Sequence, residues 1–157
     1  MFLMALTIMA SELPPRPMTV EVMRDPITDA VRADATLRDD GNRLVVSCDP
    51  AEYDGPRIRV HSRRWLGRGH LFSGHRPVIY RFDGQRPRRM LWDIEDRRAT
   101  LSRGRRVAAF LRELQTAQRL VIRARDVENR RFDMIFRLKE VAPALGQALA
   151  ACDADSA

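Results

Sequence analysis

The residues of this sequence that are best able to do chemistry are arginines, and they are concentrated in its middle third. Residues 57–106 contain 15 arginines and 4 acidic residues, a net charge of +11, whereas residues 1–56 have a net charge of −5. Guanidinium groups bind carboxylates, phosphates and sulfates, and concentrated charge attracts anions more strongly than dispersed charge. The block therefore predicts an anion-binding surface. The alternative is a solvated face that follows from an arginine-rich composition, because Lys139 is the only lysine.

Six arginines of this block are the candidate anion-binding or partner-binding residues, because we expect them to lie in loops between strands. They are Arg63, Arg64 and Arg68 in one loop and Arg86, Arg88 and Arg89 in the next. We hypothesise that these two loops form one positive surface, able to bind an anionic polymer or an acidic protein. Trp65 and Phe72 are the aromatic candidates for stacking on nucleic-acid bases. Tyr80, Phe82 and Trp92 instead have the spacing of strand residues that face a core.

The other reactive residue types do not form a catalytic or metal-binding pattern in the sequence. His61, His70 and His75 have spacings of nine and five, which fit no standard metal motif, and arginines in the same segment oppose a dication. No serine has the glycine context of a nucleophile elbow. We therefore expect a protein without metal, cofactor or enzymatic activity.

The two cysteines, Cys48 and Cys152, admit two interpretations. In an exported chain they would form one disulfide, and in a cytosolic chain they would be two buried thiols that behave as small apolar residues. Cys48 ends a predicted strand and Cys152 ends the apolar face of the last predicted helix. We predict that they bond and attach this helix to the sheet.

Hydrophobic periodicity predicts the elements that must position these residues. Period-two alternation favours strands near residues 18–23, 30–37, 57–61, 78–82, 90–94, 120–124 and 132–138, and a short apolar run predicts a further strand at 43–48. A helix is predicted at about 105–117, because Val107, Phe110, Leu111 and Leu114 fall on one helical stripe. A second helix is predicted at about 142–152. The order indicates an α+β fold, with a mainly antiparallel β-sheet and two helices.

The N-terminal residues suggest how the chain is divided and where it acts. Residues 1–11 are apolar and end in small residues, as a signal segment does, but the basic n-region is missing. Either the true start codon lies upstream, or the segment is a remnant of a longer leader. Residues 12–17 form a Pro-rich linker, and residues 18–153 form a single α+β domain. The expected location is periplasmic or secreted, and cytoplasmic if the segment is not a leader. No apolar run is long enough for a membrane span.

Several segments resemble the VasI/TagO family of exported proteins associated with the type VI secretion system. They are residues 43–48 (RLVVSC), residues 80–83 (YRFD), Trp92, residues 110–123, and the last strand with the segment ending at Cys152. The resemblance covers about Met18 to Cys152. It implies a periplasmic or lipoprotein location, a non-enzymatic accessory role and a cysteine pair. The chain differs from the family in its incomplete leader, which has no lipobox cysteine, and in its arginine-rich middle block.

Together these features predict a non-catalytic exported accessory or binding protein of the bacterial cell envelope, with an association with type VI secretion as one form of this role. The expected partner is a cell-envelope or secretion-system protein, or an anionic polymer. The alternative is a nucleic-acid-binding protein that uses the arginine-rich block 57–106.

Overall fold

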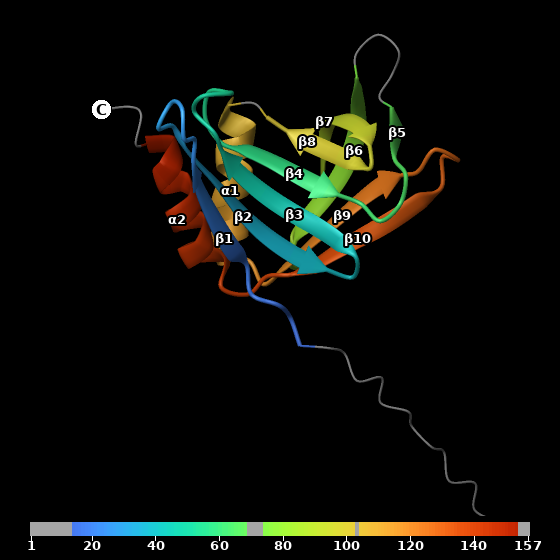
Figure 1. Ribbon diagram of the computed structural model, residues 1–157. Coiled ribbons are helices and arrows are strands. Elements are labelled where there is room, and N and C mark those ends of the chain that lie inside the picture. The colour runs from blue at the N-terminus through green and yellow to red at the C-terminus, as the bar shows by residue number, and fades with distance from the viewer. Residues whose placement is uncertain (1–13, 69–73, 103, 154–157) are drawn as a thin grey trace, which may run out of the picture.

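The structure, a computed structural model, describes residues 14–68, 74–102 and 104–153. Figure 1 shows the ten strands and two helices of these residues. In chain order they are β1 (Thr19–Arg24), β2 (Val31–Asp39), β3 (Asn42–Cys48), β4 (Arg57–His61), β5 (Gly67–Arg68), β6 (His75–Phe82), β7 (Arg88–Asp96), β8 (Arg98–Leu101), α1 (Gly104–Thr116), β9 (Arg119–Arg125), β10 (Arg131–Arg137) and α2 (Val141–Asp153).

Antiparallel pairing joins these strands into one sheet. Its order is β1-β2-β3-β4-β8-β7-β6-β9-β10, and β5 pairs with β7. The expected α+β class, with a mainly antiparallel sheet and two helices, is therefore confirmed. The turn between β2 and β3 is formed by Asp40 and Gly41, which have φ angles of 44° and 72°. Two consecutive positive φ angles are typical of the two-residue hairpin turn that matches the twist of the strands.

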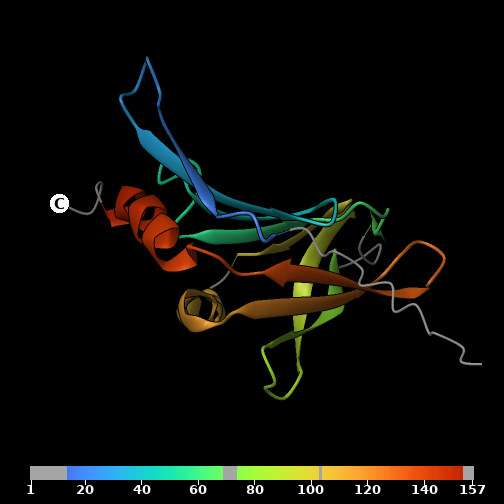
Figure 2. The ribbon, with the colours of Figure 1, turned by 90° about the horizontal axis from the view of Figure 1, so that it is seen from below.

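The sheet curls into a half-barrel around the hydrophobic core. Figure 2 shows β2, β3 and β4 facing β9 and β10, with both helices at one end of the space between them. In β4, β6 and β9 the buried apolar residues alternate along the strand toward this interior, as Ile58 and Val60 do in β4. Phe110 of α1 is fully buried there, and its ring centroid lies 5.1 Å from that of Tyr80 and 5.0 Å from that of Phe82.

Two contacts hold the ends of the half-barrel in place. At the seam between β2 and β10, the Arg137 guanidinium donates from Nη2 to Asp39 Oδ1 (2.7 Å) and from Nε to Asp39 Oδ2 (2.9 Å). At the other site, the sulfur atoms of Cys48 in β3 and Cys152 in α2 lie at bonding distance, with their Cα atoms 5.2 Å apart. The structure thus brings together the two cysteines that the sequence predicts to bond, and this attaches α2 to the sheet.

The observed elements differ from the expected ones mainly in the middle of the chain. The short strands β5 and β8 are not predicted, because two and four residues are too few to establish a period of two. β8 lies between β4 and β7 in the sheet, so β4 does not pair with β6. The helices begin and end within one residue of the predicted positions.

The predicted signal segment, residues 1–11, and the first two residues of the Pro-rich linker lie outside the described residues, and residues 14–17 have no regular secondary structure. Of the helices in the described part of the chain, none is long and apolar enough to span a membrane.

Candidate anion-binding surface

The first predicted arginine loop, between β4 and β5, is fastened to the turn between β2 and β3. Arg63 Nη1 lies 3.5 Å from Asp40 Oδ1, and the Arg63 backbone N–H donates to Asn42 Oδ1 at 3.1 Å. The carbonyl of Arg63 accepts a hydrogen bond from Arg97 Nη1 at 2.9 Å. The charge and the backbone of Arg63 therefore already have partners within the fold.

Arg64 and Trp65, in the same loop, contact the turn between β9 and β10. Arg64 Nη1 lies 3.8 Å from Asp126 Oδ2, and its guanidinium carbon lies 5.1 Å from the centroid of the Phe132 ring. The carbonyl of Trp65 accepts from the Val127 N–H at 3.2 Å. The Trp65 side chain stays accessible, since 46% of the residue is exposed.

Asp126 organises this turn from a buried position. Its Oδ1 accepts from the backbone N–H groups of Glu128 (3.0 Å) and Arg130 (2.9 Å), and its Oδ2 accepts from Arg130 Nε (3.0 Å). Burial alone would raise the pKa of Asp126, but the hydrogen bonds from Arg130 and Glu128 outweigh it and hold the pKa below its usual value. The carboxylate is therefore ionised, and its negative charge partly compensates the positive charges of Arg64 and Arg130.

The six predicted arginines do not form one surface, which corrects the hypothesis drawn from the sequence. Arg68 lies in β5, and Arg88 and Arg89 lie in β7, rather than in loops, and only Arg86 is in the connection before β7. Arg88, at one end of β7, pairs with Tyr80, whereas Asp96, at the other end, pairs with Gly67 beside Arg68. These ends are about 27 Å apart, because a strand rises ~3.4 Å per residue. Arg88 also forms an ion pair with Glu113 of α1.

Arg89 instead belongs to a groove on the outer face of the sheet, which we call the arginine groove. Its lining residues come from β6, β7, β9 and β10 and enclose about 280 Å³: Pro77, Ile79, Arg89, Arg123, Ala124, Arg125 and Arg131. The paired residues of the β6–β9 ladder begin at Ile79 and Arg123. Pro77, two residues earlier, has no N–H to extend that ladder.

The arginine groove carries more positive than negative charge. Arg123 forms a bidentate pair with Asp133, with Nε–Oδ1 and Nη2–Oδ2 distances of 2.6 and 2.7 Å. Arg125 donates to the carbonyl (2.9 Å) and the side-chain oxygen (3.2 Å) of Asn129, which leaves its charge uncompensated. Within the described part of the chain, Arg89 and Arg131 pair with no carboxylate.

The pKa shifts of the Arg123–Asp133 pair follow from this geometry. The hydrogen bonds from the Arg123 guanidinium hold the pKa of Asp133 below its usual value, and those to Asp133 raise the pKa of Arg123. Both groups are therefore charged near neutral pH. The floor of the groove is apolar, because Ile79 is 40% exposed. Such a site can bind an anionic group that carries an apolar neighbour.

Three of the four groove arginines are missing from the sequence-based candidates. Arg123, Arg125 and Arg131 lie outside the block of residues 57–106, on which the charge argument concentrated. The information that could have identified Arg123 and Arg125 is the alternation of Leu120, Ile122 and Ala124. It assigns the intervening arginines to the opposite, solvent-facing side of β9.

The aromatic residues considered in the sequence do not line the groove. Tyr80, Phe82 and Trp92 are buried around Phe110, as their spacing predicts. Trp65 is exposed at the β4–β5 loop, and Phe72 and His70 lie outside the described residues.

The two described histidines occupy different strands. His61 is in β4, and His75 is in β6, with its Nδ1 3.0 Å from Asp93 Oδ1. Among residues 14–68, 74–102 and 104–153, no three His, Cys, Asp or Glu side chains are grouped so that they could hold a metal ion.

Comparisons of the chain with protein-family models, with curated proteins and with solved structures find no match. The family resemblance noted in the sequence is therefore not supported by these comparisons, and the argument for function rests on the geometry of the site.

Proposed function

We propose that this protein is a non-catalytic, exported accessory protein of the bacterial cell envelope, which binds an acidic protein partner through the arginine groove. The observation that carries the proposal is the charge of the groove: four arginines surround an apolar floor, and Asp133 is the carboxylate paired with one of them. An open cationic groove is suited to a partner that supplies carboxylates, because each guanidinium can donate two parallel hydrogen bonds.

The cysteine pair supports the exported location. Disulfides persist in oxidising compartments such as the periplasm, and Cys48 and Cys152 lie at bonding distance. The apolar segment of residues 1–11 and the resemblance to the VasI/TagO family favour the same location, and the latter adds an association with type VI secretion. Expression from the native upstream sequence, followed by separation of periplasm and cytoplasm, tests this part. Recovery of the protein in the cytoplasm with two titratable thiols would contradict it.

The lining of the groove favours an acidic protein over a nucleic acid. Single-stranded nucleic acids are held by aromatic side chains on which bases stack, together with a basic groove. The residues that line the arginine groove include no aromatic side chain. Its exposed apolar residue, Ile79, can instead pack against an aliphatic side chain next to the partner's carboxylates.

A binding assay with two defined probes tests the groove. The first probe is a fluorescent peptide of alternating glutamate and leucine, and the second is oligothymidylate of similar charge. We expect the peptide to bind more tightly. The double variant Arg89→Gln with Arg131→Gln should weaken its binding by about tenfold or more, because two charge-assisted contacts are lost.

The matched control removes two exposed arginines elsewhere. Arg105 and Arg106, in the first turn of α1, are exposed, so Arg105→Gln with Arg106→Gln lowers the net charge by the same amount. Equal affinities of the two double variants would show that the groove is not the site. Tighter binding of oligothymidylate than of the peptide would favour the nucleic-acid alternative.

A further inference from the structure

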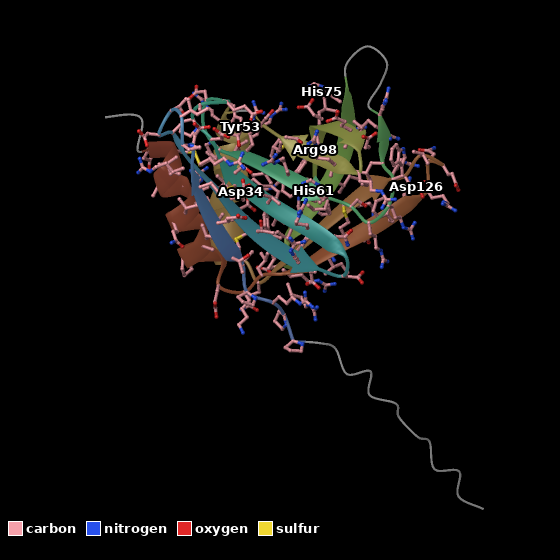
Figure 3. All side chains as sticks on the ribbon, in the orientation of Figure 1. Asp34, Tyr53, His61, His75, Arg98 and Asp126 are labelled. Atoms are coloured by element: carbon pink, nitrogen blue, oxygen red, sulfur yellow. A yellow bond between two sulfur atoms is a disulfide. The ribbon has the colours of Figure 1, made fainter. Side chains whose placement is uncertain are left out.

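A second group of cationic side chains lies on the outer face of the sheet, away from the arginine groove. In the register of the sheet, Arg43 of β3 lies opposite His61 of β4, and His61 lies opposite Arg98 of β8. Figure 3 shows His61 and Arg98 close together over β4 and β8. The same row continues to Arg38 of β2 on one side and to Glu95 of β7 on the other. We call Arg43, His61 and Arg98 the His61 cluster.

The cationic groups of the His61 cluster are only partly compensated. Arg98 pairs with Glu95, but Arg43 pairs with no carboxylate within the described part of the chain. Arg59 lies on the same face of β4, two residues before His61. It donates to Ser47, and its Nη2 lies 3.6 Å from Asp34 Oδ1, while its Nε is buried without a hydrogen-bond partner. Arg43 also lies directly opposite Arg38 of β2, and like charges in this position destabilise a sheet, so the arrangement favours an anion.

The electrostatic state of His61 reflects the same surroundings. Burial, and then the charges of Arg43, Arg59 and Arg98, lower the pKa of His61 to about 4. The imidazole is therefore neutral at pH 7 and offers one N–H donor. The carboxylates that face the group are Glu95 from β7 and Asp34 from β2, and each already pairs with an arginine.

We propose that the outer face of β3, β4 and β8 binds a tetrahedral oxyanion, a phosphate or sulfate group, between Arg43 and Arg98 and above the imidazole of His61. The spacing fits such a group. Neighbouring strands lie ~4.8 Å apart, so the backbones that carry the two arginines are separated by ~10 Å. Two extended guanidinium side chains can converge on one anion across this distance. A tetrahedral dianion presents enough acceptor oxygens for both guanidinium forks and for the imidazole N–H.

This site predicts a coupling between anion binding and protonation. Protonated His61 would add a third positive charge beside the anion, so the anion favours the protonated form and raises the pKa of His61. By linkage, the anion must also bind more tightly as pH falls. The ratio of its affinities for the protonated and the neutral form of His61 equals the factor by which the anion shifts the acid dissociation constant of His61. A shift of one pH unit corresponds to tenfold tighter binding of the anion to the protonated form.

The test is an NMR titration of the His61 imidazole in the full chain, in sulfate and in chloride at matched ionic strength. The resonance is assigned with His61→Asn. Sulfate stays a dianion across the titration, so any shift reports on the protein. We expect the His61 midpoint to rise by about one unit or more in sulfate. A parallel titration with a short polyphosphate distinguishes a free anion from the same chemistry carried on a polymer.

Two variants locate the origin of the sulfate dependence. Arg43→Gln should remove most of the dependence of the His61 midpoint on sulfate, although it raises the midpoint in chloride by removing a nearby charge. Arg89→Gln with Arg131→Gln, in the arginine groove, should leave that dependence intact, so failure of the groove and failure of this site are distinguishable. Equal His61 midpoints in chloride, sulfate and polyphosphate would overturn the proposal.

Discussion

The two faces of the strands β6, β7 and β9 differ in what determines the surroundings of their side chains: position in the strand is enough on the inner face, whereas neighbouring side chains matter on the outer face. On the inner face, Tyr80, Trp92 and Ile122 are buried against one another and against α1. On the outer face of the same strands lie Ile79, Arg89 and Arg123, which are exposed. Alternation assigns each residue to one face of the sheet. A residue assigned to the inner face of these strands is buried in the core. On the outer face, the availability of an arginine depends on its neighbours.

The arginines illustrate this dependence directly. Arg63 and Arg64 belong to the densest charge in the sequence, yet they are paired with Asp40 and Asp126. Arg89 belongs to the same block and Arg131 lies outside it, and within the described part of the chain both pair with no carboxylate. Charge density in the sequence therefore locates cations, while tertiary pairing decides which of them can bind a ligand.

The largest expected effect concerns the disulfide on the inner side. The bond joins residues 104 positions apart, and in the chain-entropy model a loop of this length stabilises by about 4–5 kcal/mol. Oxidised protein should therefore have a free energy of unfolding higher than reduced protein by this amount, as measured by urea denaturation with and without reductant. The prediction fails if the protein from an oxidising compartment shows two free thiols after unfolding, or if both forms unfold at the same urea concentration.

The next effect compares one residue from each face. Phe110→Ala, in the core, should lower the free energy of unfolding by about 3–5 kcal/mol, because it leaves a cavity among Tyr80, Phe82 and Trp92. Arg89→Ala, on the outer face, should change it by less than about 0.5 kcal/mol. Thermal melts of the two variants check both values. A drop for Arg89→Ala as large as that for Phe110→Ala would remove the distinction between the faces.

An intermediate effect is expected at the seam between β2 and β10. The hydrogen bonds from Arg137 lower the pKa of Asp39 more than burial raises it. A lowered pKa stabilises the folded state fully above the unfolded value of about 3.9, and this stabilisation is lost as pH falls through the folded value. Asp39→Asn should cost about 1.5–3 kcal/mol at pH 7.

Urea denaturation of wild type and Asp39→Asn from pH 7 down to pH 3 measures this contribution. The difference between the two proteins should be constant down to about pH 4 and should shrink below it. A difference that does not vary with pH would show that the seam is stabilised by shape and not by the charge of Asp39.

The comparison also shows how far the sequence could lead. Period-two alternation identified strands such as residues 120–124, because one face of each must be buried. Residues 43–48 were identified instead as a short apolar run, and β3 is buried at nearly all of its positions. In the same way, the apolar stripe that includes Phe110 and Leu114 predicted the helix and the face that it buries. The sequence could not show that β8 lies between β4 and β7, because pairing of non-adjacent strands depends on the curl of the whole sheet. For the same reason it could not assign Arg89 and Arg131 to one groove.

The smallest expected effect tests whether the arginine loop, as opposed to the groove, offers accessible charge. Heparin serves as the probe, because each lost contact with a polyanion reduces the salt dependence of binding by about one unit of slope. Arg89→Gln with Arg131→Gln should reduce the slope by about two. Arg63→Gln with Arg64→Gln removes the same charge, but the neighbouring carboxylates of Asp40 and Asp126 neutralise these side chains and repel a polyanion. We therefore expect the loop variant to reduce the slope by less than one and to elute close to the wild type, with Arg105→Gln and Arg106→Gln as the reference for net charge.

If the loop variant elutes earlier than the groove variant, pairing with Asp40 and Asp126 does not withhold these arginines from a ligand, and the density of charge in the sequence was the better guide to the site.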